Sequence, residues 1–354
     1  MRPIVKKLVR KGKLSYLWVT RILAAPNHYK VSPAMKLRMN VQGGFIADQY
    51  VLYGLDTHRR EDYLSEFDWY RSRWINEPFD PMLNNKVTCT EVLKHVAYVP
   101  EILMIKNKQR IWDPANPARL STAAKALDRS REVGSVFMKP IGMGKGRGVH
   151  RIDCITGDGD TAYFVDASPA TEEDVLDLFA VEDGWFLSPS IKQHPDLDAI
   201  FPNATNTARI ITMRNPDTGE VEVFFAVLRL GTSSTVPVDN GSRGGLVAKV
   251  DLETGELSAA RSLWSTEVCA THPDTGAQIQ GATVPDWQKA RDEVVRLALL
   301  FPYLQFVAWD VLVTSNGPCI IEANTSSGVN ILQLWGPQRN EKLGAFYRAH
   351  GVIK

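Results

Sequence analysis

Two apolar runs joined by a short turn near the C-terminus place the strongest constraint on how this chain can fold. The runs cover residues 307–313 and 318–321, and a Ser-Asn-Gly turn at 315–317 separates them. Asn and Gly tolerate the positive φ that a tight hairpin needs, so the stretch predicts two antiparallel strands. Asp310 and Glu322 lie inside these apolar strands, where an unpaired charge is costly. The hairpin is therefore the first candidate for a functional site.

The length of the connecting loop decides whether the two carboxylates meet. A two-residue Asn316-Gly317 turn would place Asp310 and Glu322 on opposite faces of the hairpin. A three-residue loop that ends in a left-handed Gly317 would pair them, with Cβ atoms roughly 5 Å apart. We predict the second arrangement, in which Asn324 joins the same face by the period of two. Two carboxylates and an amide oxygen suit Mg²⁺, and an acidic, solvent-facing edge hairpin is the alternative.

Length and composition are those of an ordinary globular protein. The 354 residues are 44% hydrophobic and 23% charged, which leaves room for two or three domains. No stretch reaches the roughly 18 uninterrupted apolar residues of a membrane span. The four cysteines are widely spaced, without a Cys-x-x-Cys pair, so the sequence indicates neither a zinc site nor a disulfide framework. This cysteine usage fits a reducing compartment, and we expect a cytoplasmic protein.

The first 39 residues form a basic arm. They carry ten Lys and Arg and no Asp or Glu, although the net charge of the whole chain is only +1. Ile4, Val5, Leu8 and Val9 fall on one helical face beside basic residues, a pattern that would suit an anionic membrane surface. We favour the alternative, a helix packed on the body of the protein with its basic face in solvent. A signal peptide is not expected, because Arg21 interrupts the apolar region.

Helices and strands are predicted along the rest of the chain from the period of their apolar residues. Residues 40–85 are rich in Tyr and Trp, and we expect them to be mostly helical and structural. Asp286 is a candidate N-cap for the helix that leads into the hairpin. The remaining predicted elements are helices beginning at Lys86, around 122–131 and over 286–299, and adjacent strands at 206–214 and 224–231.

A glycine-rich stretch at residues 135–152 is the second region with chemical character. Two β-rich runs enclose four glycines that alternate with other residues: Gly142, Met143, Gly144, Lys145, Gly146, Arg147 and Gly148. Glycines let backbone N–H groups close around an anion, and the two cations help to neutralise it, so the loop predicts a phosphate cover. Its strand-loop-strand flanks fit neither the P-loop nor the dinucleotide fingerprint. Lys139 lies in the preceding strand, and a basic hairpin without a ligand is the alternative.

A strand lysine followed by Pro and a glycine-rich hairpin, and far downstream by Asp-x11-Glu-x-Asn, resembles the ATP-grasp superfamily. The resemblance covers about residues 84–330. Several segments look most like the sugar-transfer-associated ATP-grasp family, whose members are encoded near polysaccharide-building glycosyltransferases: NNKVTCTEVL, FMKPIGMGKGRGV, NTARIITM, VLRLG, VDNGSRGG and IIEANTSSG. The resemblance implies an α+β fold in which two subdomains grip ATP. We expect a helical, basic-arm region at 1–85, the subdomain with the glycine loop at 86–186, and the subdomain with the metal hairpin at 187–354.

The resemblance also implies which residues hold ATP. Lys86 and Lys139 would hold the phosphates, and the loop from Gly142 to Gly148 would close over them. Two magnesium ions bridging the β- and γ-phosphates would be held by Asp310, Glu322 and Asn324. The adenine contacts would come from the segment FLSPSI, at Leu187, Ser188 and Ile191. This segment departs from the family pattern, because Pro189 offers no N–H where a Gln-Glu pair is common.

The region between these motifs carries the candidate residues for the second substrate. Arg209 and Arg229 lie on the two adjacent predicted strands, and the planar fork of arginine suits a carboxylate or phosphate. The segment VDNGSRGG resembles the R-x-N-x-x-x-G-G loop of the ribosomal-protein glutamate ligases, with Asp239 in place of the arginine. Asn240 and Arg243 would then contact the transferring phosphoryl group. A structural salt bridge at Arg209 and a plain turn at 239–241 are the alternatives.

Through this resemblance the chain is expected to be an ATP-dependent carboxylate–amine ligase that makes an amide through an acyl phosphate. Its partners would be a small carboxylate, such as a sugar acid or an amino acid, and an amine. Arg229 would hold the acyl oxygen. A kinase acting on a hydroxyl, with Asp239 as base, is the second interpretation, and a nucleotide-binding scaffold in polysaccharide assembly is the third. We expect no nucleic-acid partner, and the sequence does not indicate an oligomeric state.

Overall fold

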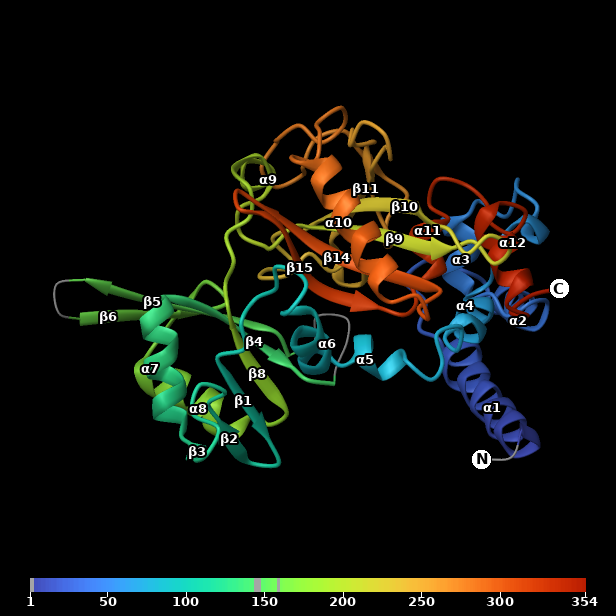
Figure 1. Cartoon of the computed structure of the whole chain (residues 1–354). Coiled ribbons are helices and arrows are strands. Elements are labelled where there is room, and N and C mark those ends of the chain that lie inside the picture. Colours follow the sequence, from blue (N-terminus) through green and yellow to red (C-terminus); the bar gives the residue numbers. More distant parts are fainter. Residues whose placement is uncertain (1–2, 143–147, 158–159) are drawn as a thin grey trace.

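The chain folds into two antiparallel sheets with a helical layer beside the second (Figure 1). The computed structural model describes residues 3–142, 148–157 and 160–354. The predicted loop residues Gly144, Lys145, Gly146 and Arg147 lie outside these ranges. Mixed helices and antiparallel sheets agree with the α+β class predicted from the sequence.

The strands divide between the two sheets in chain order. The first sheet has the order β3-β2-β1-β8-β4-β5-β6-β7, and its strands are β1 (Met104–Asn107), β2 (Arg110–Trp112), β3 (Leu120–Ser121), β4 (Ser135–Pro140), β5 (His150–Gly157), β6 (Asp160–Val165), β7 (Ser168–Ala170) and β8 (Trp185–Pro189). The second has the order β13-β12-β11-β10-β9-β14-β15, and its strands are β9 (Thr207–Arg214), β10 (Val221–Leu230), β11 (Leu246–Lys249), β12 (Ala260–Ser262), β13 (Val268–Cys269), β14 (Phe306–Thr314) and β15 (Gly317–Asn324).

The helices lie before, between and after these strands. They are α1 (Pro3–Leu17), η1 (Trp18–Leu23), α2 (Pro33–Val41), α3 (Ala47–Leu52), η2 (Arg60–Asp62), α4 (Glu66–Ser72), α5 (Asp80–Asn84), α6 (Lys86–Leu93), α7 (Ala123–Val133), α8 (Glu172–Val181), α9 (Pro195–Ile200), η3 (Gly241–Arg243), α10 (Trp287–Leu300), α11 (Val329–Leu332) and α12 (Lys342–Ala349). None of the helices in the described ranges combines the length and apolar character needed to cross a membrane.

The first sheet buries one face under two helices and leaves the other for a ligand. Thr122 caps α7, because its Oγ1 accepts a hydrogen bond from the backbone N–H of Lys125 at 3.1 Å. Leu127 of α7 then packs against Val136 and Met138 of β4 in one core. Since side chains alternate along a strand, the residues between and beyond them on β4 face the other side of the sheet.

The second sheet carries the larger core. The α10 helix lies across one of its faces, and five of its side chains are almost fully buried: Trp287, Ala290, Val294, Leu297 and Ala298. This confirms the periodicity predicted for 286–299. Asp286 does not cap the helix with its side chain as predicted, because it adopts a left-handed conformation (φ 48°) and its carboxylate pairs with Lys289 at 3.0 Å. β9 and β10 pair with each other, as predicted.

The C-terminal hairpin reaches the predicted pairing by a different route. Its loop has two residues, Ser315 and Asn316, because Thr314 pairs with Gly317, so the predicted three-residue loop is wrong. A β-bulge then shifts the register of β15 against β14. Asp310 therefore pairs with Glu322, as predicted. The extra residue in β15 restores the shared face that a two-residue loop alone would have lost.

The sheets divide the chain at positions other than those expected. The expected boundary at 186/187 falls inside β8, which hydrogen-bonds to β1 and β4 of the first sheet. The α6 helix, placed by the sequence at the start of the first subdomain, packs its Cys89 and Leu93 into the core of the second sheet. It ends at Leu93, before Pro100. We therefore place the break between the two sheets after β8.

The N-terminal region packs against the face of the second sheet opposite α10. Residues 40–85 are mostly helical and structural, as predicted, and the amide Nδ2 of Asn76 donates to the carbonyl of Phe306 in β14 at 2.6 Å. The basic arm agrees with expectation in part: α1 packs on the body through Arg10 and its described lysines are in solvent, but the apolar face predicted to be buried is exposed. Val5 is 43% exposed, Leu8 63% and Val9 44%.

Candidate functional site

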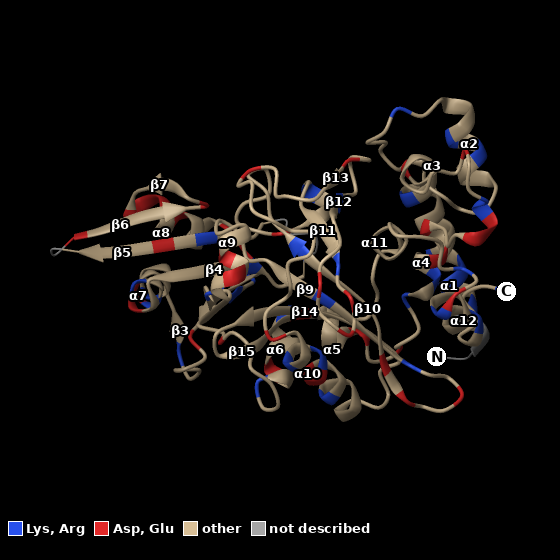
Figure 2. Ribbon diagram, turned by 90° about the horizontal axis from the view of Figure 1, so that it is seen from above, with Lys and Arg blue, Asp and Glu red and all other residues tan. Residues whose placement is uncertain are grey.

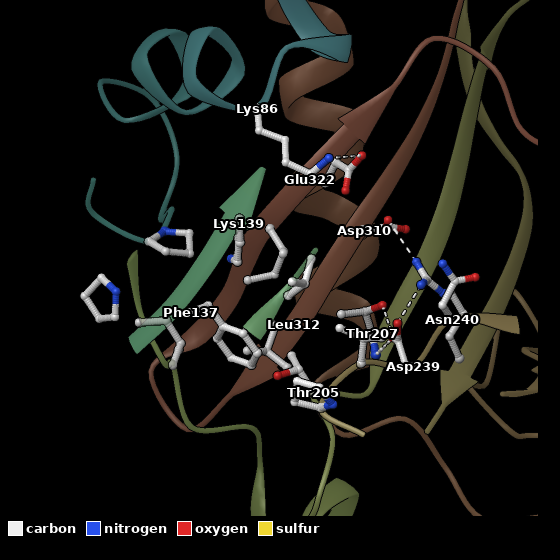
Figure 3. Close-up of a pocket in the computed structure, with 18 residues that line it drawn as sticks. Lys86, Phe137, Lys139, Thr205, Thr207, Asp239, Asn240, Asp310, Leu312 and Glu322 are labelled. Atoms are coloured by element: carbon white, nitrogen blue, oxygen red, sulfur yellow. Dashed lines mark hydrogen bonds and ion pairs between the residues drawn. The ribbon is translucent and has the colours of Figure 1, made fainter. Parts of the chain in front are cut away.

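A pocket opens between the first and second sheets. It is lined from β4 and β8 on one side, from β10, β14 and β15 on the other, and from the start of α6 (Figure 3). The lining residues are Lys86, Pro100, Phe137, Lys139, Val149, Pro189, Ile191, Thr205, Thr207, Arg229, Pro237, Val238, Asp239, Asn240, Asp310, Leu312, Ile321 and Glu322.

Two lysines and a glutamate form the cationic end of this pocket. Lys86 is the first residue of α6, and its Nζ lies 3.6 Å from Oε1 of Glu322 (Figure 3). Lys139 lies on β4, two residues beyond Phe137, and its Nζ lies 5.3 Å from the centre of the Phe137 ring. Two ammonium groups beside a single carboxylate leave this end with excess positive charge, as a phosphate site requires.

Burial perturbs the second of these lysines. Loss of hydration lowers the pKa of Lys139 to about 8, an effect that Cys319 and Glu322 oppose and that Lys86 reinforces. An ammonium group that is poorly hydrated and next to a second cation gains more than an exposed one when an anion arrives. The geometry therefore favours Lys139 as a phosphate-binding group.

An apolar slot continues the pocket away from the two lysines. Phe137 comes from β4 and Val149 directly precedes β5, whereas Leu312 and Ile321 come from the second sheet; Pro189 at the end of β8 and Ile191 beyond it lie at one side. A planar aromatic group would stack well between such side chains. The slot is thus suited to a purine base, with the lysines within reach of its phosphates.

Four charged side chains form a buried chain of ion pairs on the opposite wall. Arg209 grips Asp310 with two parallel bonds, from Nε to Oδ1 at 2.8 Å and from Nη2 to Oδ2 at 2.7 Å. Arg229 bridges the two aspartates, donating from Nη1 to Asp310 at 2.9 Å and from Nη2 to Asp239 at 2.5 Å. Thr207 completes the chain, since its N–H and hydroxyl both donate to Asp239. Arg209 therefore forms the salt bridge that the sequence offered as the alternative to substrate binding.

The ion pairs outweigh the effect of burial on the pKa of Asp310 and of Arg229. Burial alone would raise the pKa of Asp310, but the guanidinium groups of Arg209 and Arg229 bring that pKa below its ordinary value. Burial would lower the pKa of Arg229, and the two aspartates raise it instead. Burial raises the pKa of Asp239, and Arg229 and Thr207 offset this only in part.

The hairpin carboxylates retain capacity for a metal ion. An ionised carboxylate has about four lone-pair positions, and the arginines occupy one on Oδ1 and two on Oδ2 of Asp310. The remaining position on Oδ1, the partly exposed carboxylate of Glu322 and the amide oxygen of Asn324 are hard oxygen donors of the kind that Mg²⁺ takes. Among the described residues no group of three or more His, Cys, Asp and Glu forms a metal-binding cluster, so a cation here would rely on further oxygens.

The structure brings many of the predicted site residues together. Those that line the pocket are Lys86, Lys139, Ile191, Arg229, Asp239, Asn240, Asp310 and Glu322. Arg209 reaches the pocket through Asp310, and Asn324 shares the strand face of Glu322. The oxygen Oδ1 of Asn240 accepts from the N–H and the hydroxyl of Ser242, each at 2.9 Å, which makes the turn named as the alternative for this segment.

Other predicted site residues do not line the pocket. Leu187 is fully buried in the core beneath α7 and α8. Ser188 pairs with Phe137 and so shares the pocket face of the sheet; it is buried, and its hydroxyl has no hydrogen-bond partner among the described residues. Arg243 is exposed at the end of η3, and Gly142 and Gly148 are exposed at the ends of the glycine loop.

Sequence reasoning missed the walls of the slot and part of the ion-pair chain. Phe137 stands two residues before Lys139 on the same strand face, so the period of two could have found it. Thr207 and Thr205 offered no such signal, because they reach the site through the pairing of β9 with β10 and a bridge between Thr205 and Val238. Leu312 and Ile321 resembled ordinary core residues of the hairpin.

Comparison with protein families gave one match. The family model for sugar-transfer associated ATP-grasp proteins matches residues 68–342. A search of curated proteins found no match.

Solved structures with a similar arrangement share little sequence with this chain. D-cycloserine synthetase DcsG is 13% identical, with a TM-score of 0.42, and the match covers 79% of this chain and 74% of DcsG. The ATP-grasp ligase PsnB, solved with precursor peptide PsnA2 and AMPPNP, is 11% identical with a TM-score of 0.38, over 78% of this chain and 59% of PsnB. D-alanyl-alanine synthetase A from Vibrio cholerae is 12% identical with a TM-score of 0.39, over 70% and 56%. This chain spans between 53% and 64% of the PsnB chains it matches.

Proposed function

The chain belongs to the sugar-transfer-associated ATP-grasp family, as its motifs indicated, and we propose that it is an ATP-dependent ligase joining a carboxylate to an amine. The observation that carries the proposal is the composition of the pocket. An apolar slot leads to two lysines on one side, and a carboxylate hairpin with a buried arginine lies on the other. Such a site suits a nucleoside triphosphate and an anionic second substrate.

The slot and the lysines suit ATP. Its adenine would stack between Phe137 and Leu312, with Ile191 at the edge. Its phosphates would extend towards Lys86 and Lys139, both of which interact electrostatically with the carboxylate of Glu322. The glycine loop would close over the phosphates, but residues 143–147 lie outside the described part of the chain.

Magnesium would be held at the hairpin. Glu322 and Asp310 oppose each other across β14 and β15, and Asn324 lies on the same face. When bound, two Mg²⁺ ions would neutralise the negative charge that builds up on the transferring phosphoryl group. The bidentate grip of Arg209 keeps the Asp310 carboxylate in one orientation towards that position.

The acid substrate would bind beside Arg229. The contacts described above engage two of the five N–H donors of this guanidinium, which leaves donors for a further oxygen. Arg229 is 12% exposed and lines the pocket, so an acid held there would stand next to the ATP phosphates. Arg243 at the end of η3 and the side-chain amide of Asn240 would contribute from the rim.

The reaction would proceed in two steps. A carboxylate oxygen of the acid attacks the γ-phosphorus, the bond between this phosphorus and the β–γ bridging oxygen breaks, and ADP leaves. The amine then attacks the acyl carbon, inorganic phosphate leaves, and the amine loses a proton. Lys86, Lys139 and Arg229 would stabilise the negative charge in both steps, because their positions are set before the reaction begins.

A kinase that phosphorylates a hydroxyl is the second candidate. Asp239 favours it, because this carboxyl lines the pocket and burial raises its pKa towards the range of a general base. Both of its oxygens, however, already accept hydrogen bonds, from Arg229 and from Thr207. We therefore prefer the ligase and regard Asp239 as the group that orients Arg229.

Hydroxylamine trapping distinguishes the two reactions. The protein is incubated with ATP, Mg²⁺ and hydroxylamine, and with a panel of uronic, amino and hydroxy acids, and ADP, phosphate and hydroxamate are measured. We expect hydroxamate and free phosphate with one class of acid. ADP with a phosphorylated hydroxyl and no hydroxamate would establish the kinase instead. Tight ATP binding without turnover on any acid or alcohol would favour the scaffold.

Paired variants test the site itself. Glu322→Gln and Lys139→Met should each lower ADP formation at least a hundredfold, since each removes a charge beside the transferred group. Matched controls remove the same charges elsewhere in the second sheet: Glu222→Gln, whose carboxylate pairs with Lys342 at the surface, and exposed Lys249→Met. Near-normal turnover in both site variants would refute the assignment.

A further inference from the structure

The N-terminal helix α1 turns an apolar stripe towards solvent. Val5, Leu8, Val9 and Tyr16 are 43%, 63%, 44% and 68% exposed. At roughly 100° per residue, these four positions and Gly12 between them fall within an arc of about 100° on the helix. Surface helices normally turn such a stripe towards the core. Here the stripe points away from the body of the protein.

The opposite side of α1 holds the helix in place. Arg10 pairs with Glu77 at 2.6 Å, and its guanidinium lies 5.1 Å from the centre of the Trp74 ring. Leu14 and Leu17 are half-buried on the same side as Arg10. The orientation of the exposed stripe therefore follows from contacts on the other face. In Figure 1, α1 projects at the N-terminal end of the molecule, away from the first sheet.

Positive charge flanks the stripe. Lys11 lies on one side of it and Lys13 on the other, and both are exposed. The first acidic residue of the chain is Asp48, so this end of the protein is basic although the whole chain is nearly neutral. Lys and Arg mark the α1 and α2 ribbons in Figure 2. Apolar and cationic groups are arranged as in a helix that lies in the headgroup region of an anionic membrane.

We propose that α1 binds the surface of an anionic lipid membrane. Val5, Leu8 and Val9 enter the boundary between headgroups and acyl chains, Tyr16 lies at headgroup level, and the flanking lysines contact lipid phosphates and carboxylates. Lys and Arg recur along the helix, which is not apolar enough to cross a membrane, so it would lie on the membrane surface. This binding would place the pocket beside a membrane without involving any residue that lines it.

Vesicle co-sedimentation of the full chain tests this proposal. The protein is mixed with vesicles of phosphatidylcholine alone, or with about one third of the lipid replaced by phosphatidylserine, at low and physiological salt. We expect binding to the anionic vesicles that weakens with salt, and little binding to the neutral ones. Equal binding to both kinds of vesicle, or no binding to either, would overturn the proposal.

Three sets of substitutions identify the surface. Leu8→Gln with Val9→Gln and Tyr16→Gln should weaken binding at least tenfold, because the polar side chains no longer favour insertion. Lys11→Gln with Lys13→Gln should weaken it roughly thirtyfold. The matched control is Ile155→Gln with Val181→Gln, apolar side chains with comparable or greater exposure at the first sheet. Binding that survives in the α1 variants, or falls equally in the control, contradicts the proposal.

Two further measurements separate the alternatives. Each variant should keep the circular dichroism spectrum, the thermal midpoint and the ATP turnover of the parent protein, because α1 lies outside the pocket. Sedimentation velocity tests whether the stripe joins two copies of the chain. A dimer that is lost in the Leu8, Val9 and Tyr16 variant, together with no vesicle binding in the parent protein, would assign the stripe to self-association and refute the membrane surface.

Discussion

Lys139 should couple ATP binding to the uptake of a proton. Burial lowers its pKa to about 8, so about one tenth of the side chain is neutral at pH 7, about half at pH 8 and about nine tenths at pH 9. Phosphates placed beside Lys139 would favour its ammonium form and raise the pKa towards the ordinary value of about 10.4. ATP itself has no proton to exchange in this range, because the last phosphate pKa lies near 6.

The magnitude follows from these fractions. Binding should take up about 0.5 proton per site at pH 8 and about 0.9 at pH 9, and the apparent Kd should rise about tenfold between pH 7 and pH 9. The pKa in the folded protein is below the unfolded value, so the unfolded chain binds more protons between about pH 8 and pH 10.4. The contribution of Lys139 to the free energy of unfolding therefore increases as the pH rises through that window.

Isothermal titration with a non-hydrolysable ATP analogue measures the uptake. The observed enthalpy in buffers of different ionisation enthalpy gives the number of protons from its slope, at pH 7, 8 and 9. Lys139→Met should bind the analogue more weakly and lose the uptake, whereas exposed Lys249→Met should keep both. The same proton uptake in Lys139→Met as in the parent protein would show that another group titrates.

Three further predictions follow from the contacts in the second sheet and the slot. Arg229→Met should lower the free energy of unfolding by about 3 kcal/mol in urea titration, because two buried carboxylates lose a partner. Lys342→Met, which removes an exposed ion pair, should lower it by less than about 1 kcal/mol. Equal losses in the two variants would contradict a buried network. Gly245→Ala should lower the free energy of unfolding by about 2 kcal/mol, since a Cβ there would lie 2.8 Å from a backbone oxygen. Gly241→Ala, where the nearest contacts of a Cβ would be at 3.8 Å, should change the thermal midpoint little. Equal thermal midpoints in the two variants would refute the steric argument. Phe137→Ala should weaken ATP binding about tenfold, and unchanged affinity would exclude stacking.

The strands around the site could be predicted because their signals are local. The apolar runs of the hairpin, the pair of strands carrying Arg209 and Arg229, and the helix before the hairpin are all present as predicted. Period and turn chemistry are properties of a few neighbouring residues, so a single sequence carries them. The cap at Asp286 failed because its left-handed backbone conformation comes from the way the chain enters α10.

The register of the two hairpin strands could not be predicted from these local signals. The meeting of Asp310 and Glu322 was predicted from a three-residue loop, but it rests on a two-residue loop corrected by a bulge. One extra residue in a strand changes the face of every residue beyond it, and neither the period of the apolar residues nor the turn residues reveal where it is inserted. The contact was right although the local reason for it was wrong.

Residue types and spacing alone indicated Lys139, the glycine loop and the acidic hairpin as candidates, because phosphate and metal chemistry demands those groups on adjoining strands and loops, and the family resemblance added Lys86. Long-range packing set everything that joins them: the slot between the two sheets, the ion pairs that run from Arg209 to Asp239, and the outward stripe of α1. A sequence pattern shows that a helix has an apolar face or that an arginine stands on a strand. Which surface or carboxylate that group meets depends on the placement of distant elements, and local propensity does not encode this placement.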